Sequence, residues 1–121
     1  IISKYKKVVF KLLDINYDGQ VLDLMPTVQQ IMDGYVHGES VASLAASFHK
    51  TLAIAICEVG ADLCERYGID DVCISGGVFQ NRKLLNLLQH KWHHGNLYVN
   101  KKVPCNDGGL SLGQLWIAHH T

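Results

Sequence analysis

This chain lacks an excess of charge of either sign, since 11 Lys and Arg balance 11 Asp and Glu among its 121 residues. Nucleic acids and anionic membranes are bound mainly by net basic surfaces. An unbroken apolar run of about 20 residues, the length that a helix needs to cross a bilayer, is also missing. We therefore expect no nucleic-acid partner and no membrane partner. The one basic cluster, interpreted as a solvated edge, consists of Lys4, Lys6, Lys7 and Lys11.

Paired metal-binding cysteines are missing as well. The four cysteines include no CxxC pair and no Cys/His spacing of the zinc-finger kind. Cys57 and Cys64 stand two helical turns apart on one face of an expected helix, and we interpret them as small buried hydrophobic residues. Reduced thiols of this kind favour the cytoplasm over an oxidising compartment. A cytoplasmic protein is therefore expected.

The apolar pattern predicts a single α/β domain over residues 1–121, with a poorly defined lead-in at 1–24. Within the lead-in, Asp18-Gly19 signals a turn between two short strands. Beyond it, helical and strand-like patterns alternate, which indicates a parallel sheet. The helices are expected at 26–38, 40–67, 81–94 and 110–120, and the strands at 70–75 and 96–100.

Two segments of similar design stand out, "CISGGVFQN" (73–81) and "CNDGGLSLGQ" (105–114). Each places a Gly-Gly pair after a strand or loop and before a helix. Helix N-termini at the carboxyl ends of parallel strands favour anions, and glycine lets a phosphate approach the backbone. Neither segment is a Walker A loop or a GxGxxG fingerprint. A tight turn without a ligand therefore stays open beside a phosphate or nucleotide site.

Asp107 is the most suggestive single residue in these corners. Its carboxylate has two interpretations, an N-cap for the last helix or an oxygen ligand to a divalent metal that bridges phosphates. One carboxylate does not hold a metal by itself. The histidines, His49 included, are interpreted as helix-end, turn or core-edge residues rather than as further ligands. The sequence thus offers half of a metal site.

Three segments together resemble one family: "SVASLAASFHKTLA" (40–53), "CISGGVFQNRKLLNLL" (73–88) and "VPCNDGGLSLGQ" (103–114). They are similar to the carboxyl-terminal end of the hydrogenase maturation carbamoyltransferases called HypF. The resemblance implies that residues 25–121 form the last, Kae1-like lobe of a longer multidomain protein. The implied fold is one lobe of the actin, Hsp70 and sugar-kinase type of nucleotide-binding fold (ribonuclease H-like), helix-rich with a small, mainly parallel sheet.

The family resemblance also implies an enzyme, a carbamoyltransferase that makes carbamoyl adenylate from ATP and carbamoyl phosphate. The carbamoyl group then passes to the C-terminal cysteine of a partner protein, HypE, for the cyanide ligand of nickel-iron hydrogenases. The implied cofactor is ATP with a divalent metal, and Mg²⁺, Fe and Zn are not distinguished. The implied partners are HypE and the other lobe and domains of the same protein.

Residue roles follow from the same resemblance. Asp107 matches the aspartate that completes the metal site, whose two histidine ligands belong to the other lobe. Because that lobe is expected to be absent, we expect this chain alone to fold but not to catalyse. The positions that match the nucleotide site are Gly76, Gly77, Asn81, Gly108 and Gly109.

Two other functions stay open. One is carbamoyl transfer to another acceptor, such as a hydroxyl of a natural product or the amine of threonine. The other is a non-catalytic nucleotide-binding or interaction lobe that presents the helix at 40–67 to a partner. The segments "GGVFQN" and "NDGG" favour the hydrogenase branch over the tRNA-modifying branch.

Overall fold

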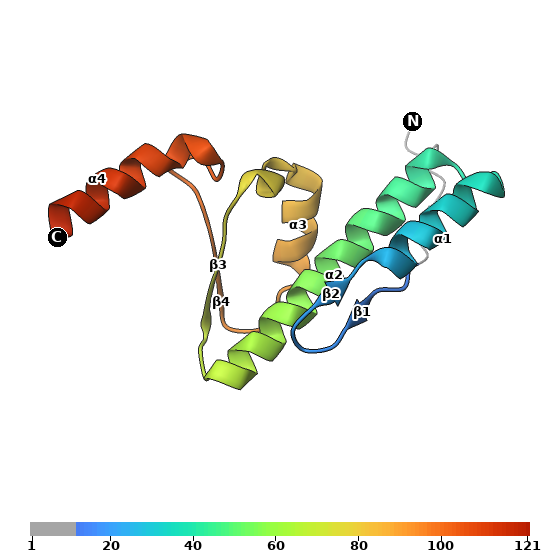
Figure 1. The fold of residues 1–121 in the computed structure, drawn as a ribbon, viewed down its shortest axis with the longest axis horizontal. Helices are drawn as coiled ribbons and strands as arrows, with labels where there is room; N and C mark the ends of the chain where they lie inside the picture. Colours follow the sequence, from blue (N-terminus) through green and yellow to red (C-terminus); the bar gives the residue numbers. More distant parts are fainter. Residues whose placement is uncertain (1–11) are drawn as a thin grey trace, which may run out of the picture.

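The computed structural model describes residues 12–121, so the predicted lysine edge lies outside the described residues. A short hairpin is followed by two helices, and strands then alternate with helices (Figure 1). The predicted element types are confirmed, and two 3₁₀ turns are added. The elements are β1 Asn16–Tyr17, β2 Leu22–Asp23, α1 Met25–Val36, α2 Val41–Tyr67, β3 Asp71–Ile74, η1 Gly77–Gln80, α3 Arg82–Lys91, β4 Asn96–Val99, η2 Asp107–Gly109 and α4 Leu110–His120.

The β1-β2 hairpin is antiparallel and turns at Asp18-Gly19, as the sequence predicts. The Asp18 carboxylate accepts the backbone N–H groups of Gln20, at 2.9 Å, and Val21, at 2.7 Å. These two hydrogen bonds hold the pKa of Asp18 below its ordinary value, because they favour the charged carboxylate. Gly19 has a φ of +90°, a conformation that glycine adopts without strain.

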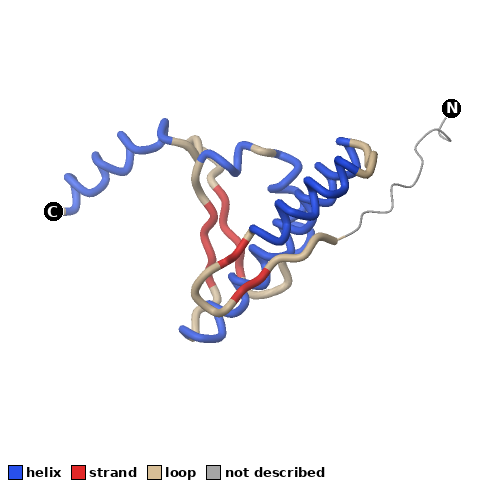
Figure 2. Tube along the Cα trace, turned by 45° about the vertical axis from the view of Figure 1, so that its right-hand side comes forward, coloured by secondary structure: helices blue, strands red, loops and turns tan. Residues whose placement is uncertain are grey.

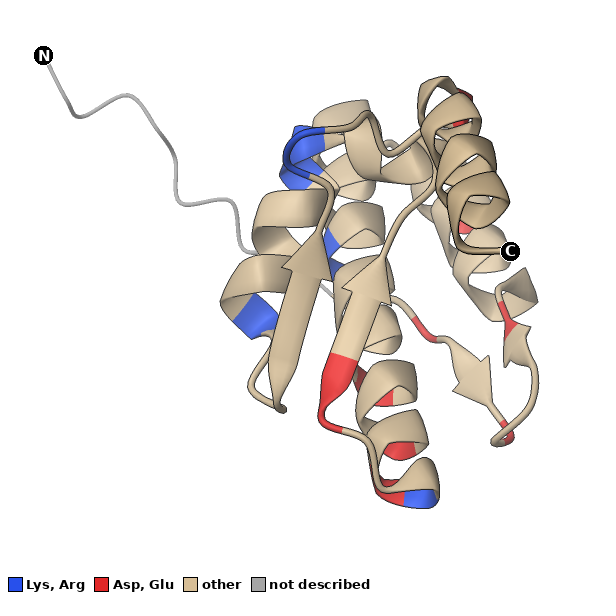
Figure 3. Cartoon of the chain, turned by 90° about the vertical axis from the view of Figure 1, so that its left-hand side faces the viewer, with Lys and Arg blue, Asp and Glu red and all other residues tan. Residues whose placement is uncertain are grey.

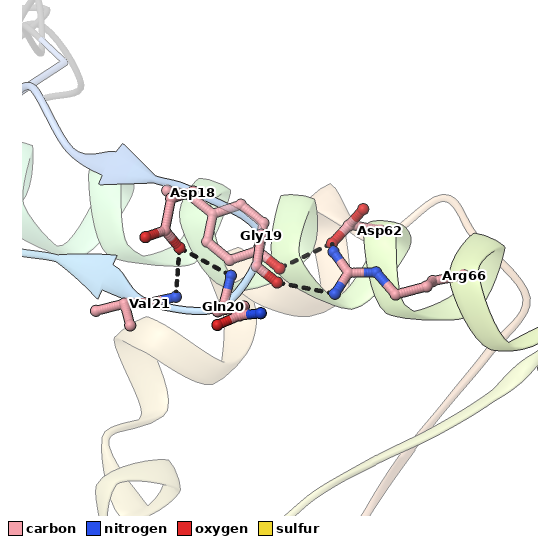
Figure 4. Close-up of polar contacts among 7 residues, drawn as sticks. Asp18, Gly19, Gln20, Val21, Asp62 and Arg66 are labelled. Carbon is pink, nitrogen blue, oxygen red and sulfur yellow. Dashed lines mark hydrogen bonds and ion pairs between the residues drawn. The ribbon is translucent and has the colours of Figure 1, made fainter.

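Two contacts fasten the hairpin to α2. The Tyr17 hydroxyl donates to the Asp62 carboxylate at 2.8 Å, and Arg66 donates to the carbonyl of Gly19 at 2.9 Å (Figure 4). Arg66 also pairs with Asp62 one turn away on the same helix. The hairpin therefore lies beside α2 (Figure 2).

The central element is α2. It begins where the Ser40 hydroxyl accepts the N–H of Ser43 at 3.1 Å, and it ends at Gly68, whose φ is +63°. By length and composition α2 could cross a membrane, although it contains no unbroken apolar run of about 20 residues. In this fold it is a core helix that packs against α1, α3 and β3. The core between α2 and α3 is built around Ala53, Leu84 and Leu88.

Strands β3 and β4 pair in parallel, which confirms the predicted sheet type. Val72 and Ile74 of β3 are partly buried, whereas Cys73 between them is exposed. Helices α2 and α3 lie behind the sheet in Figure 3, and the face toward the viewer is uncovered. Parallel sheets are usually covered on both faces. The uncovered face also exposes 51% of Tyr98 on β4.

Helix α3 ends at Lys91. The sequence predicted that it would continue to residue 94. Trp92 leaves the helix with a ψ of 122°, and its indole packs onto α2 at Gly60. A Cβ atom at Gly60 would stand 2.7 Å from the indole ring. Tertiary packing of one aromatic ring therefore shortens the helix that the local pattern extends.

Helix α4 projects away from the body of the molecule, at the upper left of Figure 1. All of its residues are exposed. The helix itself was predicted, but its apolar side chains contribute little to the core among the described residues. The exposed large apolar residues of α4 are Leu110, Leu112, Leu115, Trp116 and Ile117.

Candidate nucleotide site

The two glycine corners meet at one end of the sheet. Because β3 and β4 are parallel, their carboxyl ends lie at the same edge. The backbone N–H of Gly76 donates to the carbonyl of Cys105 at 2.7 Å and ties the first corner to the second. The sequence predicted two similar corners, and the structure brings them into contact.

The glycines of the first corner differ in what requires them. Gly76 has φ 107° and ψ 159°, a region of backbone space that is essentially restricted to glycine. Gly77 has no such φ, and a Cβ atom built there meets nothing within 4 Å among the described residues. The fold therefore explains Gly76 and leaves open space at Gly77.

The sequence interpretation assumed that the first corner leads directly into an α-helix, and the structure shows that it does not. The 3₁₀ turn η1 comes between, and α3 begins only at Arg82. Its N-cap is Asn81, whose side-chain oxygen accepts the N–H groups of Lys83 and Leu84, both at 3.1 Å. The Asn81 side chain therefore already caps the N-terminus of α3, so this N-terminus is not a vacant anion site.

Asn81 also contacts α2 through the other end of its amide. Its Nδ2 lies 2.9 Å from Nε2 of His49, and Nδ1 of that ring lies 2.7 Å from the carbonyl oxygen of Ala45. This agrees with the interpretation of His49 as a core-edge histidine. The predicted nucleotide role of Asn81 stays a prediction, and this residue has a clear structural task in addition.

In the second corner, the N-cap is Asn106 and not Asp107. The side-chain oxygen of Asn106 accepts the N–H of Gly108 at 3.0 Å. The prediction that Asp107 caps the last helix is therefore wrong, because the N-cap of α4 is Gly109 and the preceding turn η2 is capped by Asn106. Asp107 is exposed, and its carboxylate has no hydrogen bond or ion pair with any residue in the described range 12–121.

Close packing explains the second glycine pair. A Cβ atom at Gly109 would lie 2.9 Å from the carbonyl oxygen of Pro104, and one at Gly108 would lie 3.0 Å from Oδ1 of Asn106. The backbone at Gly109 is therefore folded too tightly for a side chain, whereas a side chain at Gly108 would require the Asn106 side chain to shift. The predicted part of these glycines in nucleotide binding is not needed to account for them.

A cavity of about 450 Å³ opens between the two corners and the first turns of α4. Of the predicted site residues, Gly76, Asp107 and Gly109 line it, whereas Gly77, Asn81 and Gly108 do not. The lining residues from α4 are Leu110, Gly113, Gln114 and Ile117. The predicted site residues therefore form two groups, one around this cavity and one around η1.

The chain holds one histidine pair, His90 and His94, at a spacing of four residues that the sequence interpretation missed. On one helix this spacing would place both rings on the same face. Since α3 ends at Lys91, His94 lies in the loop beyond it. Among residues 12–121 there is no group of three or more His, Cys, Asp and Glu side chains that could hold a metal ion. Asp107 therefore supplies at most one ligand.

A second cavity, of about 350 Å³, lies under the hairpin between α2 and the sheet. Apart from Tyr17, the described residues that line it include no acid, base or nucleophile. The nearby Cys57 is half-buried, and burial raises the pKa of its thiol, as does the charge of Glu58. A raised pKa makes the Cys57 thiol less reactive, and Cys57 lines a separate cavity beside Glu58 and Lys91.

The comparisons with known proteins agree on one family. The model of the carbamoyltransferase Kae1-like domain, second subdomain (HypF_C_2), matches residues 3–114. The carbamoyltransferase HypF homolog of Cupriavidus necator is 34% identical over 108 residues, which is 86% of this chain and 27% of that protein. The crystal structure of full-length HypF in the phosphate- and nucleotide-bound form matches 94% of this chain with a TM-score of 0.80 and 35% identity.

A further relative belongs to the tRNA-modifying branch. The tRNA N6-adenosine threonylcarbamoyltransferase of Microcystis aeruginosa is 27% identical over 107 residues, 86% of this chain and 31% of that protein. The chain spans only 16% of the crystallised HypF, so it corresponds to a small part of that protein. The TM-score confirms the predicted fold, a helix-rich α/β lobe with a small parallel sheet.

Proposed function

We propose that this chain forms one wall of the nucleotide site of a cytoplasmic carbamoyltransferase. The premise is that the chain belongs to the family of Kae1-like carbamoyltransferase domains, as their second subdomain. The longer protein would use ATP and carbamoyl phosphate, and HypE would accept the carbamoyl group. The lobe and domains that complete the site would come from the rest of that protein.

The observation that carries the proposal is the tied pair of corners. The Gly76–Cys105 hydrogen bond brings Asp107 to the same edge of the sheet as Gly77. The Asp107 carboxylate has no partner among the described residues, and the backbone at Gly77 is open. A polyphosphate needs close backbone approach, which Gly77 allows. Ligands of α/β folds bind at the carboxyl ends of parallel strands, where these corners lie. A relative in this family has been crystallised with phosphate and nucleotide bound.

The reaction would proceed in two transfers. Water would first hydrolyse carbamoyl phosphate to carbamate and inorganic phosphate in another domain of the longer protein. In the first transfer, a carbamate oxygen then bonds to the α-phosphorus of ATP and pyrophosphate leaves. In the second, the cysteine sulfur of HypE bonds to the carbamoyl carbon, AMP leaves, and the thiol proton passes to solvent. The part of this chain is to bind and orient the adenylate, since Gly77 admits the phosphates and the cavity walls exclude water on one side.

The unpartnered carboxylate of Asp107 fits a metal ligand. A divalent cation bound there, with further ligands from outside this chain, would offset the charge of the phosphates. Metal identity would depend on those other ligands, because one carboxylate oxygen suits Mg²⁺, Fe and Zn alike.

The second candidate function is transfer to a different acceptor. The similarity to a threonylcarbamoyltransferase, at 27% identity, favours this alternative. Both functions use an activated carbamoyl group at the same lobe, so they differ in the acceptor and not in the corners described here.

The test uses the full-length protein that carries this chain. Release of AMP and pyrophosphate from ATP is measured with carbamoyl phosphate, with and without HypE. We expect release that depends on carbamoyl phosphate, and a carbamoylated HypE cysteine by mass spectrometry. Asp107→Asn should abolish both products, whereas Asp70→Asn, at the opposite end of β3, should not. Carbamoylated tRNA or hydroxyl products in place of HypE would favour the second candidate, and normal transfer by Asp107→Asn would refute the role of Asp107.

This chain by itself should fold and release no AMP. Nucleotide affinity and metal affinity both draw on groups from two lobes, and only one lobe is represented here. Carbamoyl-phosphate-dependent AMP release by the isolated chain would contradict the proposed half-site.

A further inference from the structure

His49 differs from the other histidines that make the same backbone contact. In each of His37, His49, His90 and His120, Nδ1 lies 2.7 or 2.8 Å from the carbonyl oxygen four residues earlier. Of these four, His49 alone also forms a hydrogen bond through Nε2 to another element, at Asn81. The "FHKTLA" segment that contains His49 has no part in the proposed site so far.

The hydrogen-bond network determines which atoms donate. A carbonyl oxygen only accepts, so Nδ1 of His49 must carry the hydrogen toward Ala45. Nε2 of the neutral ring then accepts, and Asn81 must present its NH₂ group to it. The two backbone N–H groups at the start of α3 require the amide oxygen of Asn81 on the opposite side, which agrees with this orientation.

One hydrogen-bonding group of the Asn81 side chain is not used by the described residues. Its oxygen accepts two hydrogen bonds, and one of its two amide hydrogens goes to His49. The second amide hydrogen has no partner among the residues that the structure describes, and Asn81 is exposed. A flip of the amide would break all three contacts, so the free hydrogen has one orientation.

We propose that His49 is a positioning residue for the nucleotide, because it fixes the amide of Asn81 with its second hydrogen free to bind a nucleotide oxygen. This inference rests on the proposed function. Asn81 directly follows η1, the turn that begins at Gly77, so its amide belongs to the same corner as the open backbone. His49 stands on α2, the central helix, and so connects the corner to the core of the lobe.

The test compares matched variants in the full-length protein that carries this chain. His49→Leu removes the acceptor for Asn81, whereas His49→Gln can place an amide oxygen near the position of Nε2. His90→Leu is the control, because His90 makes the same backbone contact and no contact through Nε2 among the described residues. The dissociation constant for Mg²⁺-ATP is measured by calorimetry, and the melting temperature is measured alongside. A ¹⁵N spectrum of the imidazoles reports the tautomer of His49.

We expect His49→Leu to weaken Mg²⁺-ATP binding about five- to tenfold, the effect of one misplaced hydrogen-bond donor. His49→Gln and His90→Leu should stay within about twofold of the wild type. Wild-type affinity in His49→Leu, or an equal loss in all three variants, would refute the positioning role of His49 and leave the proposed function standing. A His49 ring that carries its hydrogen on Nε2 would refute the positioning role as well. A wild-type protein that binds no nucleotide would overturn the proposed function, and this inference with it.

Discussion

The backbone N–H of Gly76 and the carbonyl oxygen of Cys105 form a hydrogen bond of 2.7 Å, and this contact joins two corners from distant parts of the chain. Each corner has its own cap, Asn81 in one and Asn106 in the other. Asp107 caps neither η2 nor α4, and its carboxylate has no partner among residues 12–121. Some residues of these corners are required by the fold, and others would be required only by a ligand.

Adjacent glycines should behave differently on substitution. Gly76→Ala should destabilise the lobe by about 1–3 kcal/mol, because its backbone conformation is one that alanine adopts only under strain. Gly77→Ala should change stability by less than about 0.5 kcal/mol, because its Cβ atom meets no described residue. Chemical denaturation measures both. If Gly77→Val also leaves ATP affinity unchanged in the full-length protein, the corner is a tight turn without a phosphate beside it.

The cap of α3 should have a measurable contribution to stability. Asn81→Ala should lower the free energy of unfolding by about 0.5–2 kcal/mol, because two N–H groups lose their acceptor. Asn86→Ala, at an exposed position within the same helix, serves as the control and should be neutral or slightly stabilising. Equal effects of the two substitutions, measured by thermal unfolding, would mean that the cap contributes nothing.

The contact between the hairpin and α2 should weaken in alkaline solution. The hydrogen bond to Asp62 raises the pKa of Tyr17 above its ordinary value, and partial burial and the negative charge of Asp62 act in the same direction. The stabilisation is therefore complete below about pH 10 and is lost as the pH rises through the raised pKa. Melting temperatures from about pH 9 to pH 11 should fall more steeply for the wild type than for Tyr17→Phe. Parallel curves would rule out this contribution.

Two leucines should show how unevenly the apolar residues contribute. Leu84 is 1% exposed and packs between α2 and α3, so Leu84→Ala should cost about 2–5 kcal/mol. Leu115 of α4 is 68% exposed, and Leu115→Ala should change the stability of this chain by less than about 0.5 kcal/mol. Denaturant unfolding of the two variants tests this. A large effect at Leu115 would mean that α4 packs against the body of the lobe.

Local signals in the sequence predicted the elements well. Ser40 and Gly68 mark the ends of α2 because their residue types suit an N-cap and a left-handed C-terminal residue. Asp18-Gly19 marks the hairpin turn for a similar reason. The end of α3 was predicted too late, because the packing of Trp92 onto Gly60 is a contact between distant residues that no local pattern encodes.

The candidate site was predicted less completely. The sequence identified both glycine pairs and Asp107, but it offered two roles for Asp107 and could not choose between them. Only the position of Asn106 shows which residue caps η2. The partners of Asn81 were also beyond prediction, since His49 stands on another helix.

Local sequence was enough to predict which segments form helices, strands and turns and to reveal the family resemblance, because caps, turn residues and motifs act over a few neighbouring positions. The packed fold is needed to see that Gly76 is required by its backbone conformation, whereas a Cβ atom at Gly77 would meet no described residue. The same packing leaves the Asp107 carboxylate without a partner among residues 12–121 and brings His49 into contact with Asn81. These are relationships between side chains and backbone groups far apart in sequence, and they exist only once α2, α3 and the two parallel strands have packed together.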